Sequence, residues 1–365
     1  MVRLMNHHCM ARNAKPKSLH ALEPVCQALI ERFGDTYMRN SSHSSISRRA
    51  ALGAALLLTC GMALAQAYPS RPIRLIVPFP PGGGTDIIAR EVANKVATSE
   101  GWTIVIDNKP GSGGNIGVDA AVKASPDGYT LVLGQTSNLA INPSLYAKLP
   151  YDPVKDLAAV GLVASAPLVV VVSAASPYKK LADVVAAAKA KPTSLNYASS
   201  GNGTVAHLAT EQFQKAAGVQ FTHVPYKGAS QGLTDLVGGQ IQMYVSSVPT
   251  LIAQIKSGQL RALAVTSLQR NSDLPDVPTV AESGYKDFEA VTWFGVAGPA
   301  AMPKDAIAKL NAAFNKALAT DEVKKKLVAQ GAEVMTGTPE KFASLIRTDG
   351  VRWSAIVKSS GAKMD

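Results

Sequence analysis

Apolar residues fall into short runs that alternate with amphipathic stretches from residue 71 to the end of the chain. The first run, Ile73–Phe79, has the length of a strand and leads into a turn of two prolines and three glycines, 80–84. Beyond Thr85, apolar side chains recur close to helical spacing, at Ile87, Ile88, Val92 and Val96. This pattern predicts a strand, a glycine turn and an amphipathic helix in direct succession.

The same alternation continues through the chain. The predicted strands are Ile73–Phe79, Thr103–Asp107, Thr130–Gly134, Val169–Ser173, Leu195–Ser199, Phe221–Pro225, Ile241–Ser246, Leu260–Thr266 and Val291–Ala297. The predicted helices include Thr85–Ala97, Gly117–Ala124, Leu181–Ala190, Thr204–Ala217, Ser230–Val237, Thr250–Ser257, Lys304–Ala319 and a last one that begins at Thr338-Pro339. Strands that alternate with helices predict an α/β fold with largely parallel sheets.

Two valine-rich runs, Leu168–Ser173 and Val291–Ala297, are the places where the chain is expected to cross between two lobes. About 300 residues follow position 65, which is more than a single core usually holds. If the chain leaves lobe 1 at the first run and returns at the second, lobe 1 consists of residues 66–170 and 290–365. Lobe 2 is then the segment 171–289.

The first glycine turn has the features of an anion site. Glycines let main-chain N–H groups approach a ligand closely, and the N-terminus of the next helix carries partial positive charge. No lysine completes the phosphate-loop pattern after these glycines, so nucleoside triphosphate chemistry is not indicated. The turn is expected to hold a carboxylate or a similar anion. Its candidate residues are Pro81, Gly82, Gly83, Gly84, Thr85 and Asp86.

A second turn of the same kind follows the predicted strand Leu195–Ser199. Alone, either turn is often no more than an economical connection between a strand and a helix. Two such turns, one in each lobe, are expected to face a shared cleft beyond the carboxyl ends of the strands and to clamp a carboxylate. The candidate residues of the second turn are Ser199, Ser200, Gly201, Gly203 and Thr204.

Two further loops supply candidates with open alternatives. In one interpretation, Lys227 pairs with a ligand carboxylate and Tyr226 lines the cleft. In the other, the lysine is solvated and the tyrosine beside it is packed against the protein. The polar residues Gln135, Thr136, Ser137 and Asn138 follow the predicted strand Thr130–Gly134, where ordinary turn chemistry explains them nearly as well.

The sequence offers little evidence for an enzyme. Residues 66–365 hold two histidines, His207 and His223, and no nucleophile elbow, zincin motif or acidic cluster with metal-ligand spacing. His207 lies in the first turn of the helix after the second glycine turn, where we expect it to form hydrogen bonds rather than to act as a base. No cofactor or metal site is predicted.

Residues 1–65 are expected to be an N-terminal extension plus an export signal that is removed. The candidate translation start Met38 precedes a basic region and the uncharged run Ala50–Ala65, which ends in a small-x-small cleavage site. This run is shorter than the roughly 20 apolar residues of a membrane-spanning helix, which favours cleavage over a retained anchor. Arg48-Arg49 hints at twin-arginine export and Cys60 at lipidation, but their neighbours fit either motif poorly.

Processing also changes the composition. All three cysteines, Cys9, Cys26 and Cys60, precede the cleavage site, so the exported chain must be held by its core rather than by disulfides. Residues 1–65 hold eight of the 37 Lys and Arg residues and three of the 26 Asp and Glu residues, which leaves a formal charge of +6 on the mature chain. The basic residues are dispersed, so nucleic-acid binding is not indicated, whereas a mildly positive surface suits anionic ligands.

In order and spacing, these segments resemble the extracytoplasmic solute receptors of tripartite tricarboxylate transporters, the Bug family. The blocks that carry the resemblance span most of the mature chain. They are Val77–Asp86, Asn108–Gly117, Ile141–Tyr146, Tyr197–Gly203, Val224–Gly228, Leu236–Gln240 and Trp293–Pro299.

The resemblance implies a two-lobed periplasmic-binding-protein fold of type II, with two Rossmann-like lobes around a ligand cleft. It further implies that the two glycine turns pinch a ligand carboxylate and that a separate membrane permease receives the solute. We therefore expect a monomeric periplasmic receptor. Family members often carry aspartates where this chain has Gln242 and Ser246, which argues against an amine-bearing ligand if that strand reaches the cleft. Alternatives are a sensory receptor for a signalling kinase, a receptor for protein partners, or an α/β hydrolase or transferase.

Overall fold

The computed structural model describes residues 68–227 and 229–364, apart from the side chains of residues 229 and 230. The predicted export signal, its cleavage site and the three cysteines lie outside these residues. Within the described range, no helix has both the length and the apolar character needed to cross a bilayer.

The described elements follow the predicted alternation closely. The strands are β1 (Ile73–Val77), β2 (Ile104–Asn108), β3 (Thr130–Gln135), β4 (Leu157–Ser173), β5 (Asn196–Ser199), β6 (Thr222–Pro225), β7 (Met243–Ser247), β8 (Leu260–Val265), β9 (Val291–Pro299) and β10 (Glu333–Val334). The helices are α3 (Gly84–Glu100), α4 (Asn115–Val122), α5 (Asn142–Leu145), α6 (Leu181–Ala190), α7 (Val205–Ala217), α8 (Ala229–Val237), α9 (Val248–Lys256), α10 (Lys304–Ala319), α11 (Asp321–Ala329) and α12 (Pro339–Ser360). Two short helical turns, η1 (Ser112–Gly114) and η2 (Ser137–Ile141), complete the set.

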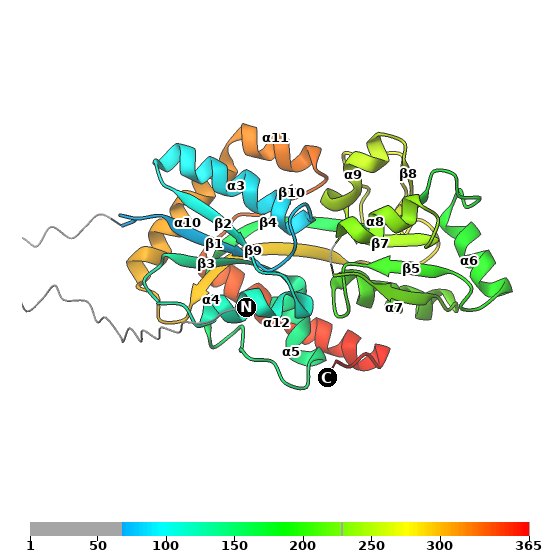
Figure 1. Cartoon of the computed structure of the whole chain (residues 1–365), viewed down its shortest axis with the longest axis horizontal. Coiled ribbons are helices and arrows are strands. Elements are labelled where there is room, and N and C mark those ends of the chain that lie inside the picture. The colour runs from blue at the N-terminus through cyan, green and yellow to red at the C-terminus, as the bar shows by residue number, and fades with distance from the viewer. Residues whose placement is uncertain (1–67, 228, 365) are drawn as a thin grey trace, which may run out of the picture. The chain divides into compact units, whose positions relative to one another are not determined.

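The strands form one mixed sheet in the order β2-β1-β3-β9-β4-β7-β5-β6, and β8 and β10 also pair with β4 (Figure 1). β1 is parallel to β2 and β3, and β5 is parallel to β6 and β7. The central strands β4 and β9 run antiparallel to their neighbours. The prediction of largely parallel sheets is therefore correct for the outer strands of each lobe and wrong for the centre.

The long strand β4 connects the two lobes. Its first part, Leu157–Pro167, pairs with β9, and its last part, Leu168–Ser173, pairs with β7 and β8. β1, β2, β3, β9 and β10 thus belong to lobe 1, and β5 to β8 belong to lobe 2. The sequence pattern predicted only the valine-rich end of β4, because its first part holds four alanines, a glycine and a proline, which have low strand propensity.

Helices cover both faces of this sheet (Figure 1). On one face of lobe 1, α3, α10 and α11 bury a cluster that includes Val92, Leu310 and Leu327. On the other face, α4, α7 and α12 contribute to a cluster that extends through both lobes and includes Leu208 and Trp353. The same arrangement places the N-termini of α3 and α7 at the carboxyl ends of β1 and β5, where the site lies.

Candidate functional site

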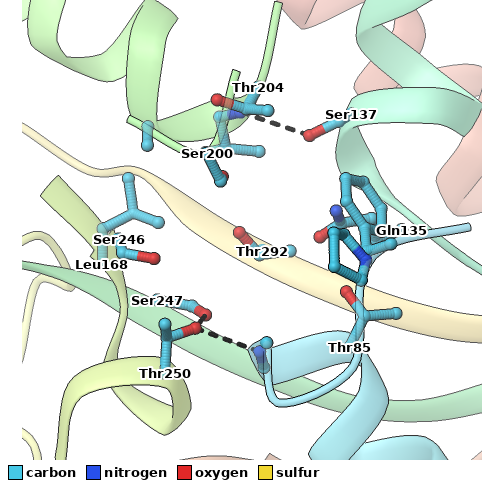
Figure 2. A pocket seen from close by; sticks show the side chains of 16 residues that line it. Thr85, Gln135, Ser137, Leu168, Ser200, Thr204, Ser246, Ser247, Thr250 and Thr292 are labelled. Carbon is cyan, nitrogen blue, oxygen red and sulfur yellow. Dashed lines mark hydrogen bonds between the residues drawn. The ribbon is translucent and has the colours of Figure 1, made fainter. Parts of the chain in front are cut away.

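A cavity of about 50 Å³ lies between the N-termini of α3 and α7 (Figure 2). Six residues of the predicted site line it: Gly83, Gly84, Thr85, Ser137, Ser200 and Thr204. The two glycine turns, which are more than a hundred positions apart in the sequence, therefore meet at one cavity. No Asp, Glu, Lys, Arg or His is among the described residues that line it.

The side chain of Asp86 stabilises the backbone of the first turn through hydrogen bonds. Gly82 adopts a positive φ of 78°, which favours glycine, and its N–H donates to Asp86 Oδ2 at 3.0 Å. Arg90 Nε donates to the same oxygen and Asn108 Nδ2 to the other, both at 2.9 Å. Burial raises the pKa of Asp86, but these hydrogen bonds outweigh it and lower the pKa below its usual value. Asp86 is thus an ionised anchor of the turn and does not line the cavity.

Two stacked histidines contact the second turn through hydrogen bonds. Gly203 N–H donates to His207 Nδ1 at 3.2 Å, and Ser199 Oγ lies 2.7 Å from His223 Nε2. The two imidazole rings stack with centroids 4.3 Å apart. The expectation that His207 serves as a hydrogen-bonding residue at the start of its helix is confirmed.

Each turn also donates to a hydroxyl of the opposite lobe. Gly84 N–H, at the start of α3, donates to Thr250 Oγ1 on α9 at 3.0 Å. Val205 N–H, at the start of α7, donates to Ser137 Oγ on η2 at 3.2 Å. Both bonds appear as dashed lines in Figure 2. The two lobes are therefore in hydrogen-bonding contact at both helix N-termini.

Further main-chain donors at these helix starts have no partner. Among the described residues, no acceptor is found for the N–H groups of Thr85 and Ala206, and both residues line the cavity. The first N–H groups of a helix lack acceptors within the helix and carry its partial positive charge. The cavity therefore offers neutral donors and a positive dipole end from each lobe, which is the chemistry of an anion site.

The other predicted site residues lie around the turns without lining the cavity. They are Pro81, Gly82, Asp86, Asn138, Ser199, Gly201, Gly203, Tyr226 and Lys227. Asn138 is buried and accepts the Gln135 N–H at 3.0 Å. Tyr226 donates to Asp235 Oδ2 at 2.5 Å, and Lys227 is exposed.

The cavity also has walls that the sequence pattern did not single out as site residues. They are Phe79, Pro80, Leu168, Val205, Ala206, Ser247, Thr250 and Thr292. Gln135 and Ser246, to which the sequence did point, line the cavity as well. Ser247 ends β7 and Thr250 lies in the first turn of α9, so their place at the carboxyl end of a strand could have pointed to them. Thr292 lies on the antiparallel strand β9, within the run Val291–Ala297 that the sequence marked as a crossing between the lobes but not as part of the site.

Comparison with known proteins accounts for this arrangement. Residues 88–362 match the profile of the tripartite tricarboxylate transporter family receptor, TctC. The chain belongs to this family. It is 39% identical to Protein BugT of Bordetella pertussis over 324 residues, which cover 88% of this chain and 99% of that protein.

Solved structures of similar proteins have the same fold. An R. palustris protein solved with adipate is 34% identical, with a TM-score of 0.79, over 81% of this chain and 100% of that one. MatC from Rhodopseudomonas palustris, solved with bound malate, is 30% identical, with a TM-score of 0.75, over 80% of this chain and 100% of that one. The predicted family and the two-lobed fold are confirmed.

The family also establishes the kind of activity. TctC receptors are periplasmic proteins that bind small carboxylates for tripartite transporters, and they are not enzymes. The chain is accordingly a solute-binding receptor. The comparisons favour neither a sensory protein nor a hydrolase.

Proposed function

We propose that this receptor binds a small organic carboxylate between its two glycine turns and delivers it to the membrane permease of a tripartite tricarboxylate-type transporter. The main support is that the N-termini of α3 and α7 meet at one cavity. Each of them has an N–H group that lacks an acceptor among the described residues. Malate and adipate, bound by similar proteins, are both small carboxylates.

Binding proceeds by closure of the lobes around the ligand. Lobe 1 is formed by residues 66–170 and 290–365 and lobe 2 by 171–289, so the turns approach each other when the chain bends at β4 and at the segment before β9. The hydroxyls of Thr250 and Ser137 already bridge the lobes at both helix N-termini. A carboxylate between the turns adds charge-assisted hydrogen bonds to the free N–H groups, which stabilises the closed form further.

The protein acts as a monomer in the periplasm after removal of residues 1–65, with translation from Met38. The mature chain, without cysteine, suits that compartment because its fold does not depend on the state of any thiol.

A carboxylate panel in thermal unfolding tests the proposal. With the protein refolded from denaturant to remove retained ligand, a carboxylate present at a hundred times its dissociation constant stabilises the fold by about 2.7 kcal/mol. The matching amides, which lack the charge, serve as controls and leave the midpoint unchanged. A flat response to a broad panel of mono-, di- and tricarboxylates contradicts the proposal.

A further inference from the structure

Three polar side chains of the cavity have no hydrogen-bond partner in the part of the chain that the structure describes. Thr85, Gln135 and Thr292 are all at least nine-tenths buried, with 5%, 8% and 3% of their surface exposed. None of their side-chain atoms bonds to any described residue, and all three residues line the cavity. None of their polar atoms is among those sealed inside the protein without a partner, so these atoms are open to the cavity and can bond to what it holds.

The three side chains come from different elements that converge on one place. Thr85 lies in the first turn of α3, Gln135 ends β3, and Thr292 lies on β9 between the two lobes (Figure 2). The neighbouring hydroxyls of Ser137, Ser247 and Thr250 differ, because each is engaged with the helix N-termini or with one another. The unpaired set is therefore separate from the groups that bridge the lobes.

The donors and acceptors of these three side chains indicate which ligand group they bind. Two hydroxyls and one carboxamide offer donors and acceptors together, and no cation lines the cavity among the described residues. A hydroxyl both donates and accepts, so it satisfies such a set at no electrostatic cost. A second carboxylate only accepts, and its charge is expensive to bury without a counter-ion.

We propose that Thr85, Gln135 and Thr292 form a subsite for a hydroxyl group of the ligand, so that the receptor prefers a hydroxycarboxylate to the same acid without the hydroxyl. This inference rests on the proposed function, since it assigns the part of the ligand that the glycine turns do not hold. A site built to pair with a hydroxyl rejects an analogue that lacks it, because its buried polar groups then stay unpaired.

The test uses pairs of acids of equal charge that differ in one hydroxyl: malate and succinate, lactate and propionate, and 3-hydroxybutyrate and butyrate. Dissociation constants are measured by calorimetry on the ligand-stripped protein. In at least one pair, the hydroxy acid binds at least about tenfold more tightly than its partner, the factor that corresponds to the net gain of one hydrogen bond. The Thr292→Val variant keeps the shape of the side chain and abolishes the difference by weakening the hydroxy acid alone.

Thr250→Val is the matched control, because its hydroxyl lines the same cavity but is already engaged with Gly84 N–H. This variant leaves the ratio within each pair unchanged. Thr85→Val repeats the test from lobe 1 should Thr292→Val fail to fold. If carboxylates bind but every pair binds equally, the subsite is wrong and the receptor function stands. If no carboxylate binds, the proposed function fails, and the subsite fails with it.

Discussion

At the scale of single residues, the carboxylate of Asp86 joins three segments around the first glycine turn. It accepts hydrogen bonds from Gly82 in the turn, from Arg90 one helical turn further on, and from Asn108 at the end of β2. Such a buried anion, when fully paired, fixes the backbone of the turn and leaves the N–H groups of the next residues free for a ligand.

Removal of this carboxylate is expected to destabilise the protein markedly. Asp86→Ala leaves three donors without an acceptor, so the free energy of unfolding falls by about 2 kcal/mol or more. Asp107→Ala is the control: this carboxylate pairs with Arg74 in a partly exposed ion pair, and its loss costs less than about 1 kcal/mol. Urea denaturation of both variants measures the difference, and equal losses contradict the anchoring role.

At the scale of elements, the second turn and the start of α7 rest on an aromatic stack. Tyr197 stacks on His223 with centroids 4.7 Å apart, and His223 stacks on His207. Burial, together with the neighbouring His207, lowers the pKa of His223 to about 3, and burial also lowers the pKa of His207, although Glu211 opposes that shift. Since Gly203 N–H donates to His207 Nδ1, that nitrogen must be unprotonated for the turn to keep this bond.

Acid should therefore weaken the fold before its carboxylates titrate. Histidines whose folded pKa lies below the unfolded value of about 6.5 bind protons in the unfolded state first, so stability is lost as the pH falls below that value. Between pH 7.5 and 5.5, the unfolding midpoint of the wild type falls by at least about 2 °C more than that of His223→Gln. Parallel curves for the two proteins contradict this account.

The elements themselves were largely predictable from the sequence. The bounds of α6 and α10 match the prediction, and the glycine turns and the strands before them lie as expected, because period and turn chemistry are local properties. α5, α11 and η2 were missed, because they are short and lack a clear apolar period. Most of β4 was missed because the segment before Leu168 has four alanines, a glycine and a proline, and its strand conformation depends on pairing with β9, a tertiary property that the local sequence does not show.

The site was predictable only in part, for a related reason. Gly83, Gly84, Ser200 and Thr204 follow predicted strands and were found by that position. Thr292 and Leu168 were not, since they lie on the antiparallel strands β9 and β4, in runs that the sequence marked only as crossings between the lobes. Asp86 and Ser199 were expected to line the site, but their side chains point to the partners that hold the turns. Side-chain direction within a turn depends on partners that are distant in the sequence.

At the scale of the whole receptor, two glycines lie where one lobe contacts the other. A methyl group on Gly84 would lie 2.5 Å from Ser247 Oγ and 3.2 Å from Thr250 Oγ1, both in lobe 2. A methyl group on Gly203 would collide with Leu145, which belongs to α5 in lobe 1. At Gly84 the added atom would meet only lobe 2, so this glycine permits contact between the lobes rather than local folding. Gly203 is required for a second reason as well, because its φ of 75° favours glycine within the turn itself.

The affinity of Gly84→Ala for a carboxylate identified in the panel tests the central claim most directly. Because Gly84 lies in a helix, alanine there preserves folding, but its methyl group keeps the lobes apart, and the dissociation constant rises at least about tenfold, or about 1.4 kcal/mol. Gly83→Ala, whose added atom meets only Pro80 O at 3.6 Å, changes it less than about twofold, or about 0.4 kcal/mol. Adding Ser247→Ala to Gly84→Ala removes the colliding oxygen and restores part of the affinity. Unchanged affinity in Gly84→Ala, with intact folding, contradicts a carboxylate clamp formed by the two turns.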